Sequence, residues 1–315
     1  MSKAAIWPRI HRVTDAGPRA LIVGSMGPEV PVHLHGRLMD LFGGMQTGAT
    51  TRSLSWHLGQ PDIAGSVLVY AATARQFGFT PFLSCLWPLP TPEMYLRKVE
   101  GLDADTTNVR IVPGDVPATL RWIGTDGEML LRQPDMAKEM TPYVPRSLRG
   151  FEMALFDFGG AADRLQQLHA LAGKIESCVV SVSADSSWTE DEFRALEDCN
   201  ALVFLSERDA IIVANRIRGG NCVDARTAAA VIKHYLGHTR LIANVGRSGA
   251  FLMNGSLHEM PQKNLAVPRP LECKDRLMAA TTALLAKGHE DVEALGLVVN
   301  GITHGLSSQC GAAAQ

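Results

Sequence analysis

From residue 153 onward, short apolar runs alternate with longer segments in which apolar residues recur every three or four positions. Short, continuous apolar runs are typical of buried parallel strands, and the longer periodic segments predict helices. We expect strands at 153–158, 177–184, 201–206, 239–246 and 249–255, and helices at 162–175, 189–198, 207–217, 224–237, 276–287 and 290–303; earlier in the chain, a strand at 20–24 and a helix at 64–78 follow the same pattern. Strands that alternate with helices in this way predict an α/β fold with a doubly wound, mostly parallel sheet.

Two β-rich stretches interrupt this alternation in the first half of the chain. Residues 31–63 are rich in Gly, Thr and short alternations, and residues 112–132 contain a hairpin that we expect to turn at Asp126 and Gly127. Neither stretch has the apolar character of a core. We therefore expect one α/β domain over residues 1–315, with these two stretches forming a small β lid.

The composition is typical of a well-packed globular protein, with 46% hydrophobic and 20% charged residues among 315. A formal net charge of −2 gives no electrostatic reason to expect a nucleic acid or an anionic membrane as a partner. No window approaches the roughly 18 uncharged apolar residues of a membrane helix. The six cysteines are spaced singly, without a C-x-x-C pair, which suits reduced thiols in the cytoplasm.

Asp275 stands directly before an apolar helical pattern that ends at Gly288. One interpretation is an N-cap, in which the carboxylate complements the helix dipole. The other is a general base, with the amides of the first helical turn binding a phosphate while the carboxylate takes a proton from a substrate hydroxyl. The residues next to Asp275 do not decide between these two roles.

A glycine-rich turn lies upstream, within the segment 241–255. One strand is expected to end at Gly246 and another to start at Gly249. Glycines at the carboxyl edge of a sheet let the backbone approach a nucleotide, although an ordinary hairpin uses the same residues. The turn therefore supports a nucleotide site only in combination with other motifs.

The order and spacing of these motifs resemble the PfkB/ribokinase family of ATP-dependent sugar and nucleoside kinases. That family has a T-x-G-x-x-G-type turn followed by a G-A-G-D motif, and this chain has NVGRSG at 244–249 and ECKD at 272–275. Similar elements follow the same order from about residue 20 to about residue 305. The resemblance implies a ribokinase-like fold, a small-molecule substrate beneath the lid, and ATP with Mg²⁺ as cofactors.

The resemblance also implies roles for individual residues. Asp275 would be the general base, and the backbone of Cys273 and Lys274 would form the anion hole. The other matching positions are expected to bind the nucleotide (Asn244, Gly246, Gly249 and Asn300), the substrate (Glu29 and Gly65) and magnesium (Ser206 and Asp209).

The proposed phosphate site departs from the family pattern. Glu272, Cys273 and Lys274 stand where the family has Gly-Ala-Gly, whose small residues let a phosphate approach closely. A carboxylate at position 272 would repel a phosphate by about 4 kcal/mol at roughly 4 Å and an effective dielectric near 20. Lys274 can offset this repulsion by binding the phosphate as a point charge. Ser206 and Asp209 replace the Asn and Glu of the magnesium motif, but both still offer oxygen ligands.

Five side chains have competing interpretations. His33 and His35 alternate on one face of a strand, either as lid surface or as two metal ligands without a third. Trp56 and His57 either pack within the lid or stack on a planar substrate. Asp209 has a rival role as a carboxylate in the first turn of a helix. The GSMG stretch after the first strand lacks the third Gly and the later acidic residue of a dinucleotide fingerprint, which argues against a dehydrogenase.

The expected activity is transfer of the γ-phosphate of ATP to a small sugar-like or nucleoside-like substrate. Val69 and Ala64 replace the Asn and the first Gly of the family's substrate motif, and residues 85–90 lack its G-x-D. An ordinary hexose or ribose is therefore not the expected acceptor. Two alternatives stay open, a non-catalytic relative that binds a ligand or regulates, and an enzyme with another phosphoryl donor. A homodimer formed through the lid is compatible with each of them.

Overall fold

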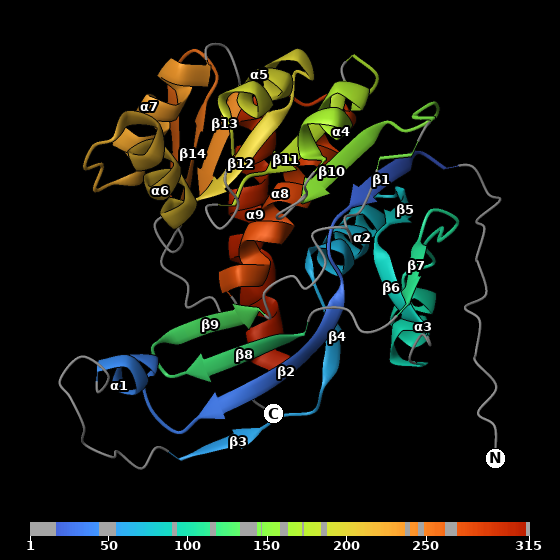
Figure 1. The fold of residues 1–315 in the computed structure, drawn as a ribbon, viewed down its shortest axis with the longest axis vertical. Coiled ribbons are helices and arrows are strands. Elements are labelled where there is room, and N and C mark those ends of the chain that lie inside the picture. Colours follow the sequence, from blue (N-terminus) through green and yellow to red (C-terminus); the bar gives the residue numbers. More distant parts are fainter. Residues whose placement is uncertain are drawn as a thin grey trace.

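A computed structural model describes residues 17–43, 55–89, 93–113, 118–132, 144–145, 147–157, 163–171, 173–183, 188–236, 240–244, 249–261 and 270–312. Within these residues an eight-stranded sheet has the order β15-β14-β13-β12-β11-β10-β1-β5. In that order the strands are Leu257–Pro261, Gly249–Met253, Arg240–Asn244, Leu202–Ser206, Ser177–Ser181, Met153–Asp157, Arg19–Val23 and Thr80–Ser84. All neighbours from β13 to β5 pair in parallel, and β14 and β15 extend the sheet antiparallel. The mostly parallel α/β sheet expected from the sequence is confirmed (Figure 1).

Helices cover both faces of this sheet (Figure 1). One layer contains α2 (Ser66–Gln76), α3 (Glu93–Glu100), α8 (Pro270–Ala286) and α9 (Asp291–Ala312), and the other contains α4 (Arg164–Leu171), α5 (Glu190–Asp198), α6 (Glu207–Arg218) and α7 (Ala225–Leu236). Alternate strand residues point to opposite layers, so that Ala20 and Ile22 pack in one core and Leu21 and Val23 in the other. Burial on both faces explains why these strands read as continuous apolar runs.

A second, smaller sheet projects from one end of the molecule (Figure 1). Its order is β3-β2-β8-β9, with β4 paired to β2, and these strands are Trp56–Leu58, Gly27–Leu34, Thr119–Gly124, Gly127–Arg132 and Asp62–Ala64. We call this sheet the lid. The β-rich segments of the sequence supply most of it, although β7 (Arg110–Pro113) pairs with β6 (Leu86–Leu89) in a separate two-stranded ribbon. The hairpin turn consists of Thr125 and Asp126, because Gly124 pairs with Gly127.

The C-terminal part of the sequence differs from its prediction at two helix boundaries, because α8 begins earlier than expected and α9 ends at Ala312 rather than at residue 303. Helix α8 begins at Pro270, whereas the hydrophobic pattern predicted a start at residue 276. Proline is favoured in the first turn of a helix, because its missing N–H has no intrahelical acceptor there. Asp275 therefore lies inside α8, in its second turn, and is not the N-cap of that helix.

Two short elements escaped the sequence analysis. Helix α1 (Leu38–Gly43) lies at the end of the lid, where the Asp126 carboxylate accepts hydrogen bonds from the amides of Leu38 and Met39 at 2.5 and 3.1 Å. Strand β15 adds to the edge of the main sheet beyond β14. Neither element has a buried periodic face long enough to predict it from the sequence.

Candidate active site

The strand order of the main sheet reverses at β1. The chain places β5 on one side of β1 and later returns to place β10 on its other side. In open α/β sheets, ligands bind at the carboxyl ends of the strands near such a switch point. Strands β10, β11 and β12 end on this edge with Asp157, Ser181 and Ser206, so the topology gathers polar side chains from distant segments.

Asp275 is partly buried in α8, and a tyrosine from α2 reaches it. The Tyr70 hydroxyl donates a hydrogen bond to Oδ1 of Asp275 at 3.4 Å and lies 3.4 Å from the sulfur of Met278. Tyr70 is fully buried, and this desolvation, together with the carboxylates of Asp275 and Asp157, raises the pKa of its phenol well above the ordinary value. The phenol therefore stays protonated and serves as a donor to Asp275.

Asp157 joins this group, although the sequence analysis did not single it out. It ends the buried strand β10, and its carboxylate acts electrostatically on Tyr70. A Cβ placed on Gly24, just after β1, would lie 3.1 Å from the Ser66 hydroxyl and 3.4 Å from Cβ of Asp157. Asp157 therefore stands at the switch point itself. The signal in the sequence was a single carboxylate at the end of the apolar run MALFD.

Ser206 and Asp209, the pair expected to bind magnesium, form a capping box at the start of α6. The Ser206 hydroxyl lies 2.5 Å from Oδ2 of Asp209 and accepts a hydrogen bond from the Asp209 amide at 3.1 Å. The Lys274 ammonium lies 3.7 Å from the same Oδ2. Among the described residues, no group of three His, Cys, Asp or Glu side chains is placed to hold a metal ion. The geometry shows the capping role of Asp209. Mg²⁺ usually keeps several of its waters and takes only one or two carboxylates, so a role of this pair in binding Mg²⁺ stays a proposal.

The early start of α8 changes the expected anion hole. In α5, α7 and α9 the amide of the fourth helical residue donates to the carbonyl of the residue before the helix. A helix that begins at Pro270 therefore has both the Cys273 and the Lys274 amides in its hydrogen-bonded part. The anion hole expected at these two residues stays a proposal, and the Lys274 side chain is paired with Asp209. The side chains of Glu272 and Cys273 lie outside the described residues.

The expected nucleotide residues occupy the far end of the same edge. Asn244 ends β13, and Gly249 starts β14 with a φ of 118°, a conformation that favours glycine. Gly246 lies outside the described residues. Asn300 is exposed on α9. The structure thus places Asn244 and Gly249 on the predicted edge without testing what they bind.

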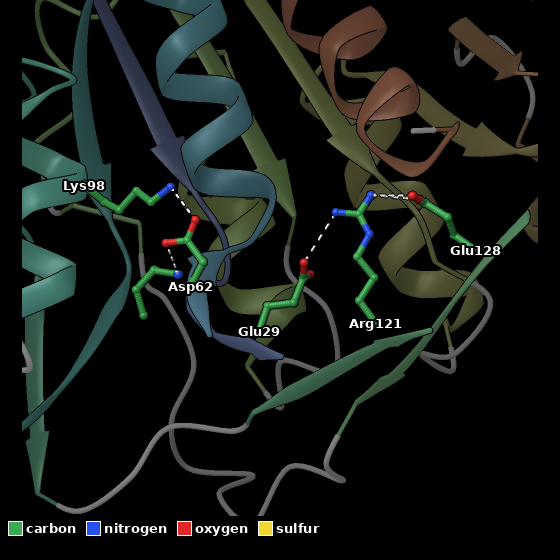
Figure 2. Close-up of polar contacts among 6 residues, drawn as sticks. Glu29, Asp62, Lys98, Arg121 and Glu128 are labelled. Carbon is green, nitrogen blue, oxygen red and sulfur yellow. Dashed lines mark hydrogen bonds and ion pairs between the residues drawn. The ribbon is translucent and has the colours of Figure 1, made fainter. Parts of the chain in front are cut away.

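Glu29, the expected substrate ligand, belongs to a row of charges on the lid (Figure 2). Arg121 Nη2 lies 2.9 and 2.8 Å from the two carboxylate oxygens of Glu128, and Arg121 Nη1 lies 3.4 Å from Oε1 of Glu29. The side chains of Arg121, Glu128 and Glu29 are only 9%, 5% and 16% exposed. The sequence analysis missed Arg121 and Glu128. In the sequence they are only two charged residues within a largely apolar hairpin.

Gly65 precedes α2 and has a φ of 139°. A side chain there would collide with the backbone carbonyl of Ser25, so a glycine is required at the point where the lid returns to the main sheet. This requirement explains the glycine without any substrate. A role of Gly65 in substrate binding stays a proposal.

Trp56 and His57 lie on opposite faces of β3, because successive strand residues point in opposite directions. The His57 ring stacks on His33 with centroids 4.8 Å apart, and its Nδ1 lies 3.2 Å from Nε2 of His35. Trp56 is 53% exposed. The two residues therefore cannot stack together on one face of a substrate.

No family model matches the chain, and no curated protein sequence matches it. Solved structures do. A ribokinase from Cryptococcus neoformans var. grubii in complex with ADP has a TM-score of 0.69 at 16% identity, covering 90% of this chain and 92% of that one. An Arabidopsis thaliana ribokinase complexed with ribose and ATP has a TM-score of 0.66 at 14% identity, covering 90% of each chain.

A third structure, a Burkholderia thailandensis nucleoside kinase in complex with inosine, has a TM-score of 0.66 at 14% identity, covering 89% of this chain and 88% of that one. Identities this low establish the fold alone. None of the helices in the described residues is long and apolar enough to span a membrane. The chain has the ribokinase-like fold, a doubly wound, mostly parallel α/β sheet with a small β lid.

Proposed function

We propose that this protein is an ATP-dependent kinase that phosphorylates a hydroxyl group of a small sugar-like or nucleoside-like molecule. Proteins with the same fold were crystallised with ADP, with ribose and ATP, and with inosine. The observation that carries the proposal is the position of Asp275. Its carboxylate lies near the carboxyl edge of the parallel sheet and is held there by a buried, protonated Tyr70.

In the proposed reaction Asp275 is the general base. Its carboxylate accepts the proton of the substrate hydroxyl while the hydroxyl oxygen forms a bond to the γ-phosphorus of ATP. The bond between that phosphorus and the β,γ-bridging oxygen breaks, and ADP leaves with the electron pair. Such enzymes accelerate phosphoryl transfer mainly by positioning and charge stabilisation, and a carboxylate held by a fixed donor suits this task.

The other expected site residues belong to the proposal as positions around this base. The nucleotide would lie along the edge formed by Asn244, Gly246 and Gly249, with Asn300 on α9 nearby. The first turn of α8, which contains Cys273, and the ammonium of Lys274 would face its phosphates. The substrate would lie between this edge and the lid, where Glu29 offers a carboxylate to its hydroxyl groups. Of the lid pair, we keep His57 rather than Trp56 on this side, because His57 shares the face of Glu29 by strand register. Mg²⁺ would arrive bound to ATP, without Ser206 and Asp209 as its ligands.

A non-catalytic binding or regulatory protein is the second candidate. Two features favour it. The Lys274 amide lies in the hydrogen-bonded part of α8, and the Lys274 side chain forms an ion pair with Asp209. Both features lie where the kinase proposal requires a phosphate-binding site. This candidate predicts ligand binding without turnover.

Replacement of Asp275 by Asn tests the kinase proposal. Loss of a general base lowers the rate of a reaction by about 10²–10⁴-fold, so D275N should lose nearly all turnover while it still binds ATP. The measurement is ADP release across a panel of sugars, nucleosides and hydroxylated heterocycles, with ATP affinity from calorimetry. The matched control is D191N, which changes a carboxylate on α5 whose side chain is 74% exposed. ATP binding without turnover in the wild-type protein would favour the second candidate.

We also propose a homodimer formed through the lid, and a cytoplasmic location in keeping with the four free cysteines among the described residues. The strand register places Leu58, Leu120 and Leu131 on the lid face opposite Glu29. These three side chains are 59%, 41% and 46% exposed. An exposed apolar face of this kind is typical of an interface, and a second copy of the same face would cover it.

A further inference from the structure

The Lys274 side chain occupies an unusual position. Its ammonium lies 3.7 Å from Oδ2 of Asp209, and the two side chains are only 19% and 15% exposed. Lys274 comes from α8 and directly precedes Asp275, whereas Asp209 lies in the first turn of α6, just after the carboxyl end of β12. The ion pair therefore joins two helix starts at the edge where the phosphates of a nucleotide are proposed to lie.

The same geometry works against a divalent cation at Asp209. Oδ2 of Asp209 already receives the Ser206 hydroxyl at 2.5 Å, the Ser206 amide at 3.4 Å and the Lys274 ammonium. A cation bound through Oδ2 would have to displace the hydrogen bonds that this oxygen accepts from the Ser206 hydroxyl and amide. It would also lie beside an ammonium of the same sign, and at such distances the repulsion between like charges is large.

We propose that Lys274 supplies the positive charge that faces the phosphates, in place of a divalent ion held by Ser206 and Asp209. This inference rests on the proposed binding of a nucleotide triphosphate at this edge, and it extends that proposal to how the phosphates are held. Asp209 keeps the ammonium at the edge, and the positive ends of the α6 and α8 dipoles add to its field. Lysine binds phosphate as a point charge, so it needs no fixed coordination geometry.

The two carboxylates near Lys274 then have separate tasks. Asp209 holds the ammonium and caps α6, whereas Asp275 accepts a hydrogen bond from Tyr70 and is the proposed base. A lysine between them neutralises part of the negative charge that a triphosphate would otherwise meet. This division explains why a residue as large as lysine is compatible with a phosphate site at position 274.

The test is calorimetric titration with inorganic tripolyphosphate and with ATP, once in excess EDTA and once in excess MgCl₂. The variants are K274Q, which removes the charge, K274R, which keeps it, and D209N, which keeps an oxygen acceptor for the cap but loses the negative charge. Circular dichroism melts show that each variant is folded. Turnover is measured separately on the wild-type protein.

We expect both phosphate compounds to bind the wild-type protein in EDTA. K274Q should weaken this binding by about tenfold or more, because a hydrogen bond to a charged group contributes at least that factor. K274R should lose less than K274Q. D209N should change the affinities in EDTA and in Mg²⁺ by the same factor, since no metal depends on that carboxylate.

Binding that appears only with Mg²⁺ and disappears in D209N would overturn this inference and leave the proposed kinase intact. Binding in EDTA that depends on the charge at position 274, without turnover on any substrate, would support the inference and remove the proposed activity. If neither compound binds in either condition, both the inference and the nucleotide part of the proposed function are wrong.

Discussion

The charged row of the lid allows one prediction to be worked from the structure. Arg121 makes two hydrogen bonds to Glu128, at 2.8 and 2.9 Å, and one contact with Glu29 at 3.4 Å, and all three side chains are at most 16% exposed. The substitution R121M keeps most of the length of the side chain and removes its charge. Two carboxylates are then left on one face of the lid, close together and shielded from water.

R121M is expected to destabilise the lid strongly. Removing one partner of a buried ion pair destabilises a protein by about 3–5 kcal/mol, because the remaining charge stays buried without compensation. The Coulomb estimate agrees, since two unit charges about 3 Å apart attract by about 5 kcal/mol at an effective dielectric near 20. At about 1.4 kcal/mol per factor of ten, R121M should raise the equilibrium constant for local unfolding of the lid sheet by roughly two to four orders of magnitude.

Amide hydrogen exchange of residues 119–132 measures this local unfolding directly. The control is R97M in α3, where Arg97 pairs with Glu93 at 2.6 Å but the two side chains are 74% and 67% exposed. An exposed pair on a helix contributes only about 0.3–0.5 kcal/mol, so R97M should leave exchange in the lid unchanged. If R121M alters lid exchange as little as R97M does, the reasoning from burial is refuted.

Three further predictions follow from other buried or exposed groups. The raised pKa of Tyr70 means that the folded phenol keeps its proton above pH 10.0, where the unfolded phenol loses it. The free energy of unfolding should therefore fall as the pH rises in this range, and should fall less in Y70F. Urea-unfolding curves that shift equally with alkaline pH in the wild-type protein and in Y70F would contradict this prediction. Burial raises the pKa of Cys85 to about 12 and that of Cys199 to about 11. Brief iodoacetamide treatment at neutral pH should therefore leave both thiols unmodified, as measured by peptide mass spectrometry. Rapid modification of either thiol would contradict this prediction. If the lid is the dimer interface, light scattering should show a dimeric wild-type protein and a monomeric L58K variant. Equal masses for the two proteins would show that the lid does not form a dimer.

The main sheet was predictable from sequence because its strands are buried on both faces. A run such as 153–157 must be apolar at every position when helices cover both sides, and that requirement leaves a clear pattern. The lid has one polar and one apolar face, so its strands show only short alternations. Its β-rich character was predictable, whereas its exact pairing, including the separate ribbon of β6 and β7, was not.

The candidate site was predictable only in part, because its partners are far apart in the chain. Tyr70 and Asp275 are separated by 205 positions, and no local pattern links a tyrosine in an apolar helix to that carboxylate. The helix-capping role of Asp209 was visible as a local motif, since Ser206 and Asp209 have the spacing of a capping box. Lys274 showed only its charge in the sequence, and its contact with Asp209 depends on how α8 and α6 meet.

Two of the connections between the lid and the α/β domain are short, residues 24–26 between β1 and β2, and Gly65 between β4 and α2. Strand β1 is held between β5 and β10, so this end of the lid is anchored to the centre of the main sheet. A movement of the lid about this anchored end displaces Glu29, the third residue of β2, less than His33 and His57, which lie farther along the sheet. The charged row is therefore the part of the lid whose distance from the edge that ends in Asp157 changes least.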